Sequence, residues 1–251
     1  MPDSILQAAH LYKQYTTHQG YLSAVEDVSF QVAPGEFLGI VGPSGCGKST
    51  LLRLLAGLLQ PDQGQVYLHG QLLQGPRHEI GFVFQEANLM PWRTVFDNVM
   101  LPLQVQRIPL SEAKEQATRA LELVDLVEFA DNYPHELSGG MAQRVAIARA
   151  LTYQPEILLL DEPFGALDAL TRENLNQELM RLWEISRKTV VMVTHNIREA
   201  VFLADRVLVL TQRPGRVAKI IPVTLPRPRP ISMIYSDTFG ALAYEVRQAI
   251  Q

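Results

Sequence analysis

The segment from residue 42 to residue 50, Gly-Pro-Ser-Gly-Cys-Gly-Lys-Ser-Thr, constrains the fold of this chain more than any other. It matches the pattern G-x-x-x-x-G-K-[ST] of the phosphate-binding P-loop, in which glycines let the backbone curve so that its N–H groups face an anion. Lys48 supplies a positive charge for the β- and γ-phosphates, and the hydroxyl of Ser49 can bind Mg²⁺. The apolar run 36–41 predicts a strand before the loop, and residues 50–57 predict a helix after it. This context disfavours the alternative, an ordinary glycine-rich turn.

The P-loop predicts that the chain binds a nucleotide together with Mg²⁺. The positive end of the helix dipole near Lys48 adds to the attraction for phosphate. The loop residues expected to contact the nucleotide are Gly42, Pro43, Ser44, Gly45, Cys46, Gly47, Lys48, Ser49 and Thr50.

Composition narrows the class of protein. The chain has 251 residues, of which 47% are hydrophobic and 19% charged, and its net charge of −4 argues against a partner bound through a large basic field, such as nucleic acid. Its single cysteine, Cys46, excludes an internal disulfide and a multi-cysteine metal site. No apolar run reaches the ~20 residues of a membrane helix, and the first residues do not resemble a signal peptide. We therefore expect a cytoplasmic protein that can dock on a membrane protein.

The pattern along the chain predicts an α/β fold with two additions to the P-loop core. Residues 1–33 alternate apolar and polar side chains, which predicts antiparallel strands, and residues 65–69 predict part of a hairpin. Residues 86–151 have helical spacing and predict an inserted helical subdomain, whose clearest helix spans 111–124 with Ser111 as its N-cap.

Three short apolar runs then predict central strands of a parallel sheet. They comprise residues 157–160, 190–193 and 207–210.

The C-terminal residues 222–251 are expected to lie outside the nucleotide-binding domain, which we assign to residues 1–221. Prolines at 226, 228 and 230 predict an extended segment that carries Arg227 and Arg229 outward. Residues 238–250 have the spacing of a short amphipathic helix, which could pack on its own domain, pack on a partner, or fray.

Two acids follow the apolar strand 157–160. Asp161 can bind Mg²⁺ directly or through water, and Glu162 can act as the general base for an attacking water. The alternative is a strand that ends in a solvated acidic turn, but the upstream P-loop makes the catalytic interpretation the better one.

A second predicted anion site lies at Leu137-Ser138-Gly139-Gly140. Ser138 is a good N-cap for the helix that follows, and the two glycines leave its backbone amides accessible. The alternative is a capped helix without a ligand. Together with the P-loop upstream and the acids downstream, this segment resembles the signature motif of the ABC ATPases, although Met141 stands where glutamine is commoner.

The resemblance to the ABC ATPases covers about residues 5–221 and implies further roles in the order that the family follows. Gln85 matches the glutamine that senses Mg²⁺ and the γ-phosphate. Residues 166–168 match the D-loop, with Asp168 at the nucleotide. His195 matches the switch histidine, which contacts the γ-phosphate. The family's ligands are ATP and Mg²⁺, and its activity is ATP hydrolysis.

The family also has an aromatic residue that stacks on adenine. Tyr15 lies in the N-terminal strands and matches it best, but Tyr12 and Tyr21 compete, and a plain surface tyrosine is a further alternative.

Finally, the resemblance implies partners. In the family two chains dimerise head to tail, so that each ATP lies between the P-loop of one chain and the signature segment of the other; the second subunit can be a copy or a similar ATPase. Residues 89–95, Leu-Met-Pro-Trp-Arg-Thr-Val, resemble the nitrate, sulfonate and taurine importer group, where this region receives the integral-membrane permease. Leu89, Met90 and Trp92 suit such an apolar contact, but they could instead pack within the helical subdomain.

The resemblance therefore implies the ATPase subunit of a bacterial importer for a small anion. Such a subunit lies on the inner face of the plasma membrane and works indirectly with a periplasmic or lipid-anchored substrate-binding protein. The alternatives are the ATPase of an exporter or extraction complex and a non-transport ABC ATPase.

Overall fold

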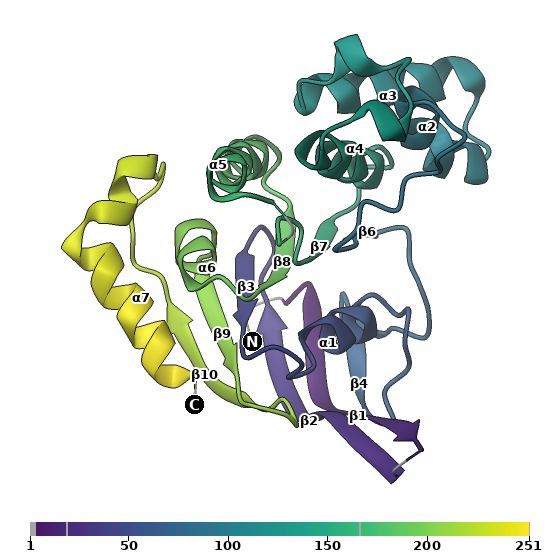
Figure 1. Ribbon diagram of the computed structural model, residues 1–251. Coiled ribbons are helices and arrows are strands. Elements are labelled where there is room, and N and C mark those ends of the chain that lie inside the picture. The colour runs from purple at the N-terminus through teal and green to yellow at the C-terminus, as the bar shows by residue number, and fades with distance from the viewer. Residues whose placement is uncertain (1–3, 19, 166, 251) are drawn as a thin grey trace. The chain divides into compact units, whose positions relative to one another are not determined.

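The computed structural model describes residues 4–18, 20–165 and 167–250, and the chain divides into two compact units. Unit 1 comprises residues 1–77 and 187–251, and unit 2 comprises residues 78–186 (Figure 1). Among the described residues, no helix has the length and apolar character needed to cross a membrane.

An antiparallel sheet begins unit 1, as the alternating pattern predicts. Its strand order is β2-β1-β4-β5. The inward side chains of β1 include Leu6, Ala8 and Leu11, which are buried, while its last residues are exposed. The strands are β1 (Leu6–Thr17), β2 (Gly20–Val32), β4 (Gln63–Leu68) and β5 (Gln71–Leu72).

The other strands of unit 1 form the order β10-β9-β3-β8. β3 runs parallel to both β8 and β9, and every residue of β3 and β8 is buried, as expected for strands covered on both faces. The edge strand β10, which the sequence did not indicate, pairs antiparallel with β9. These strands are β3 (Phe37–Val41), β8 (Thr189–Thr194), β9 (Arg206–Leu210) and β10 (Val217–Pro222).

Two helices follow the carboxyl ends of these parallel strands. α1 (Lys48–Leu55) comes after β3, and α6 (Ile197–Leu203) comes after β8. The register pairs Val41 of β3 with Thr194 of β8, so the segments after these two residues leave the sheet at the same edge. In open α/β sheets this carboxyl edge is where ligands bind.

Unit 2 combines a pair of parallel strands with a group of helices. β6 (Ile80–Val83) runs parallel to β7 (Ile157–Asp161). The predicted helical subdomain forms a hydrophobic core of its own, centred on side chains such as Val99, Leu121 and Val145. Its elements are α2 (Val95–Val105), α3 (Leu110–Leu123), the 3₁₀ turns η1 (Val127–Phe129) and η2 (Pro134–Glu136), and α4 (Gly139–Leu151), and it is followed by α5 (Ala169–Ser186).

The predicted N-cap of the clearest helix was wrong. α3 begins at Leu110, with Pro109 in the N-cap position, and Ser111 lies within the first turn. The φ of Pro109, −53°, is already close to a helical value, so the ring starts the helix without a capping side chain.

The C-terminal residues pack within unit 1. After the 3₁₀ turn η3 (Ile231–Tyr235), α7 (Asp237–Ala249) buries Phe239 and Val246 and contacts α6, β9 and β10 (Figure 1). Of the possibilities that the sequence left open, the structure shows a helix packed on its own unit. Whether the boundary at residue 221 separates the nucleotide-binding domain from a dispensable tail stays a prediction.

The expectation that Arg227 and Arg229 point outward was wrong. Arg229 is 5% exposed and donates hydrogen bonds to backbone carbonyls near the end of α6, and Arg227 pairs with Asp205. The last carbonyls of a helix lack partners within the helix, and arginine supplies several donors to such groups. The Pro-rich segment forms neither helix nor strand and bends at Arg227 and Pro228, and the direction of its arginine side chains depends on α6.

Candidate functional site

The P-loop follows β3 and surrounds the side chain of Lys48. Gly45 and Gly47 have φ values of +73° and +105°, a region that favours glycine. Lys48 is 5% exposed, and its Nζ donates to the carbonyls of Gly42 and Pro43, both at 3.1 Å. The N-cap of α1 is Gly47, which has no side chain to occupy the first amides of the helix. The loop thus combines a held positive charge with a helix N-terminus, as a phosphate site requires.

Backbone from β2 and from the turn around Gly215 packs closely against the P-loop. A Cβ on Gly47 would lie 2.4 Å from the carbonyl oxygen of Ala24 in β2, and a Cβ on Gly215 would lie 2.3 Å from that of Cys46. Gly215 itself exchanges backbone hydrogen bonds with β2, donating to Ala24 and accepting from Glu26, both at 3.0 Å. Sequence reasoning missed Gly215, because only the tertiary contact distinguishes it from an ordinary turn glycine after a proline.

The structure places Tyr15 beside the P-loop helix. Its hydroxyl is 3.2 Å from Oγ1 of Thr50, and the side chain remains partly exposed. Tyr21, another of the three tyrosines considered for stacking on adenine, is 81% exposed and pairs with Thr16 near the turn between β1 and β2. The contact with Thr50 therefore supports Tyr15 as the aromatic residue nearest to a nucleotide in the loop.

His195 lies at the same sheet edge as the P-loop, one residue past β8. Its two neighbours are fixed by the first turn of α6: the Asn196 side chain accepts from the amides of Arg198 and Glu199, and Thr194 Oγ1 bonds the Glu199 carboxylate. Oγ1 of Thr194 also accepts from the Asn196 amide at 3.0 Å. His195 itself is exposed, so it can reach a ligand at this edge.

In unit 2, three predicted residues lie at the carboxyl edge of β6 and β7. Asp161 ends β7 and is 2% exposed, and Glu162 turns away from the strand with φ of 44°, a sparsely populated value for a non-glycine residue. The register pairs Val83 with Leu160, so Gln85, two residues past β6, leaves the strand pair at the edge that carries both acids.

The signature segment begins α4. Ser138 is the N-cap and accepts a hydrogen bond from the Met141 amide at 3.2 Å, while Ser138 and Gly139 are exposed. Gly140 is buried, and a Cβ there would lie 3.0 Å from the Thr171 side chain, which explains the need for glycine.

The D-loop lies close to the signature segment. Asp168 accepts from the Thr171 amide at 3.0 Å, and hydrogen bonds from the Thr171 hydroxyl and backbone lower the pKa of its carboxyl group. Because Thr171 also contacts Gly140, the structure brings Asp168 near the start of α4. Ala166, the first residue of the matched D-loop, lies outside the described residues.

Sequence reasoning missed two residues that hold the segment around Gln85. Gln143 is 4% exposed and donates to the Phe84 carbonyl at 3.1 Å, and Arg149 donates to the carbonyls of Ala87 and Asn88 at 2.7 and 2.9 Å. Both lie on α4, so the helix that carries the signature segment also fixes the backbone beside Gln85. Gln143 follows the signature segment by three residues, but nothing local in the sequence indicates its partner.

The apolar residues of the segment 89–94 were considered for two roles, contact with a permease and packing within the helical subdomain, and their surroundings differ. Leu89 packs against the hydrophobic core of the helical subdomain, whereas Trp92 is 71% exposed. The fully buried side chain of Asn98 holds the segment by bonding backbone atoms of Met90 and Arg93. Trp92 is thus presented on an ordered loop, and Leu89 has a structural role.

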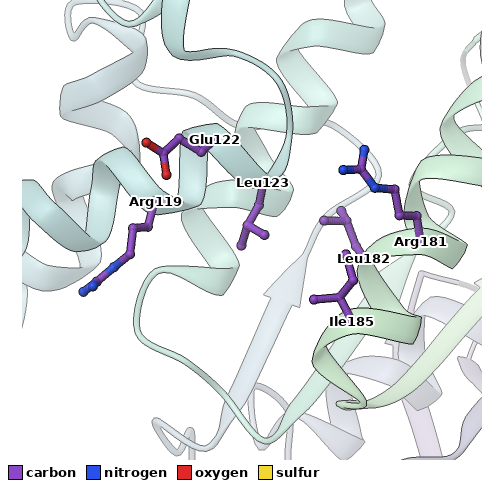
Figure 2. A pocket seen from close by; sticks show the side chains of 6 residues that line it. All are labelled: Arg119, Glu122, Leu123, Arg181, Leu182 and Ile185. Carbon is purple, nitrogen blue, oxygen red and sulfur yellow. The ribbon is translucent and has the colours of Figure 1, made fainter.

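A cavity of about 330 Å³ lies between α3 and α5 (Figure 2). Aliphatic side chains line it, together with two arginines and one glutamate, and none belongs to a nucleotide motif. The lining residues are Arg119, Glu122, Leu123, Arg181, Leu182 and Ile185.

Comparison with known proteins gives consistent matches. The family model described as "ABC transporter" matches residues 25–165. The chain is 47% identical over 228 residues to the nitrate import ATP-binding protein NrtD of Synechococcus elongatus, covering 90% of this chain and 83% of that protein. It is 49% identical over 207 residues to the aliphatic sulfonates import ATP-binding protein SsuB of Bacillus licheniformis, covering 82% and 80%.

Among solved structures, the fold is similar to that of the ATP-binding cassette MJ0796. The structure described as a dimeric post-hydrolysis state bound to ADP and Pi has a TM-score of 0.77 and 35% sequence identity, and the match covers 88% of this chain and 100% of that one.

The close contact behind the P-loop gives a first prediction. Gly215→Ala should weaken ATP binding by about tenfold, equivalent to about 1.4 kcal/mol, because its Cβ must displace the backbone at Cys46. Gly240→Ala is the matched control, since a Cβ at Gly240 meets nothing within 4 Å. Titration with a fluorescent ATP analogue measures both affinities, and an unchanged affinity in Gly215→Ala would show that the P-loop does not depend on this contact.

Proposed function

Because this chain belongs to the ABC transporter family of ATP-binding subunits, which hydrolyse ATP, we propose that it energises an importer for a small anion. The family and fold that the motifs predicted are confirmed by the family model, by the relatives and by the solved cassette. The observation that carries the importer assignment is the similarity to nitrate and aliphatic sulfonate import proteins along at least four fifths of the chain. The proposed cargo is therefore nitrate, a sulfonate or a related anion.

ATP is proposed to bind with its phosphates in the P-loop and its adenine on Tyr15. The loop amides and Lys48 neutralise the β- and γ-phosphates, and the proximity of Tyr15 to Thr50 supports the stacking role. His195 contacts the γ-phosphate from the end of β8. In unit 2, Ser138, Gly139 and Asp168 are exposed and are proposed to contact a nucleotide in the dimer described below.

Mg²⁺ fits the oxygen donors that the chain offers. Ser49 provides a hydroxyl, Gln85 an amide oxygen and Asp161 a carboxylate, which are ligands of the kind that this cation prefers. Asp161 is 2% exposed and is the last residue of β7, so it lies at the carboxyl edge of this strand. When bound, Mg²⁺ neutralises charge on the phosphates.

Glu162 is proposed to act as the general base. Its carboxylate accepts a proton from a water molecule as the water oxygen attacks the γ-phosphorus and the bond to ADP breaks, so that ADP and phosphate form. Lys48 and His195 stabilise the negative charge on the phosphoryl oxygens during this step.

The active form is proposed to be a dimer of this chain, or of this chain with a similar ATPase. Ser138 and Gly139 are exposed at the start of a 13-residue helix, where the amides of the first turn can bind an anion. The solved cassette that resembles this chain is described as dimeric. In the proposed dimer, each ATP lies between the P-loop of one subunit and the signature segment of the other.

The dimer is proposed to dock on permease subunits at the inner face of the plasma membrane through the segment 89–94. Trp92 is large, exposed and held on an ordered loop, which suits an apolar partner surface. A substrate-binding protein would contact the permease and not this chain. Identification of the membrane proteins that co-purify with the chain tests the assignment, and capture of an exporter permease would contradict it.

If Glu162 is the general base, replacing it should slow ATP hydrolysis without preventing ATP binding. Glu162→Gln should retain ATP binding but hydrolyse ATP ~100-fold more slowly, because an amide is a poor base. Phosphate release measures the rate, and Glu128→Gln, an exposed glutamate of the same unit, is the control. Hydrolysis at the wild-type rate by Glu162→Gln would remove Glu162 from this role.

The shared site predicts complementation between two inactive chains. Lys48→Ala removes the charge at the phosphates, and Ser138→Arg blocks the signature segment. A heterodimer with one defect in each chain keeps one intact composite site, so part of the activity should return, as measured by phosphate release from mixed, separately tagged chains. Verified heterodimers without activity would contradict a site shared between subunits.

The docking surface predicts a selective defect in assembly. Trp92→Ala should retain folding and ATP binding but lower the amount of permease that co-purifies. Leu110→Ala is the matched control, because Leu110 is also apolar, 62% exposed and in unit 2. Equal recovery of the permease with all three proteins would return Trp92 to the role of an ordinary surface residue.

A further inference from the structure

The position of His195 depends on a short helix. α6 has seven residues, and helices of this length are not stable alone in water. Its first turn binds both neighbours of His195, since the amides of Arg198 and Glu199 donate to Asn196, and Thr194 bonds the Glu199 carboxylate. Any shift of α6 along its axis must therefore move the backbone that carries His195.

The far end of α6 is held by the C-terminal residues. Nη1 of Arg229 donates to the carbonyls of Val201, Phe202 and Ala204 at 3.2, 2.8 and 2.8 Å, and its Nη2 donates to Leu225 within the same segment. Arg229 is 5% exposed, so these carbonyls compensate a nearly buried cation. A positive charge at a helix C-terminus also interacts favourably with the helix dipole.

Arg227 adds a second connection at this end. Its guanidinium bonds the Leu203 carbonyl and pairs with Oδ1 of Asp205 at 2.8 Å. The other carboxylate oxygen of Asp205 accepts from the amide of Phe37, the first residue of β3, at 2.9 Å. The same group of bonds therefore joins the end of α6 to the strand that leads into the P-loop.

A third connection holds the beginning of α6. Arg198 donates to the Ile234 carbonyl at 3.3 Å, and its guanidinium carbon lies 5.9 Å from the centre of the Phe239 ring. Phe239 is buried and anchors α7. The C-terminal residues thus contact α6 at both of its ends.

We propose that residues 223–249 form a C-terminal strap that positions the switch histidine through α6, with Arg229 as the main positioning residue. The proposal rests on the proposed contact of His195 with the γ-phosphate. The strap binds no nucleotide. It fixes where α6 begins relative to β3, and so where His195 stands relative to the P-loop, because β3 and β8 are adjacent strands of one sheet.

Hydrogen exchange tests the strap independently of catalysis. In the protein without nucleotide, Arg229→Met should increase amide exchange of residues 197–204, because the carbonyls at the end of α6 lose their donors. Arg247→Met is the matched control, an exposed arginine on α7. Unchanged exchange in Arg229→Met, or the same increase in Arg247→Met, would overturn the strap.

ATPase kinetics test the effect on His195. Arg229→Met should lower kcat about tenfold, the size expected when a catalytic group is displaced by less than 1 Å, while ATP affinity changes by less than about threefold. Arg229→Lys keeps the charge and should restore part of the rate. In a His195→Ala background, Arg229→Met should change the remaining single-turnover rate by less than about twofold, because the two residues act through one contact.

The outcomes separate this proposal from the function on which it rests. Full activity of His195→Ala would contradict the role of His195 in the proposed function. Full activity of Arg229→Met beside an impaired His195→Ala would contradict the strap alone, as would an equal loss of rate in both backgrounds. If Arg229→Met does not fold, Arg227→Met replaces it with the same two predictions, since Arg227 also holds the end of α6 through its bonds to Leu203 and Asp205.

Discussion

The structure depends on a backbone loop that closes around the ammonium group of Lys48. That closure needs positive φ at Gly45 and Gly47, and it needs backbone from elsewhere to approach without intervening side chains. β2 supplies one such approach at Gly47, and the turn between β9 and β10 supplies the other at Gly215. The N-terminal sheet and the hairpin of β9 and β10 therefore both help to shape the P-loop, because the loop packs against backbone from each of them.

The residues proposed to contact the nucleotide lie at or beside the N-termini of three helices, α1, α4 and α6. The N-cap residues of these helices differ in a way that fits the proposed roles. Gly47 has no side chain, which leaves the amides of α1 to phosphate. Ser138 occupies one amide of α4 and leaves others accessible. Asn196 accepts from two amides of α6, so fewer amides of this helix end are available to an anion. Under the proposals made above, the cap residue distinguishes the two termini that bind phosphate from the one that positions His195.

Local patterns predicted most of the fold and proposed the candidate site residues, whereas tertiary contacts decided features that the sequence left open. The P-loop, the acids after β7 and the order of Gln85 and His195 follow from short motifs beside strands, and the alternation in the first strands follows from their buried face. Three tyrosines compete in the sequence for the role of stacking on adenine, and the contact between Tyr15 and Thr50 favours Tyr15. The arginines of the Pro-rich segment were placed outward because their partners, the carbonyls of α6, lie about 25 residues earlier in the sequence.

The residues that carry the proposed chemistry are divided between the two units. Lys48 and His195 belong to unit 1, whereas Gln85 and Glu162 belong to unit 2. Under the proposed function, Gln85 is the group of unit 2 that senses Mg²⁺ and the γ-phosphate. In unit 2, α4 holds the backbone on both sides of Gln85 through Gln143 and Arg149, and that backbone continues into the segment that presents Trp92. Within unit 2, these bonds therefore join the backbone at Gln85 to the segment 89–94, which we propose docks on the permease.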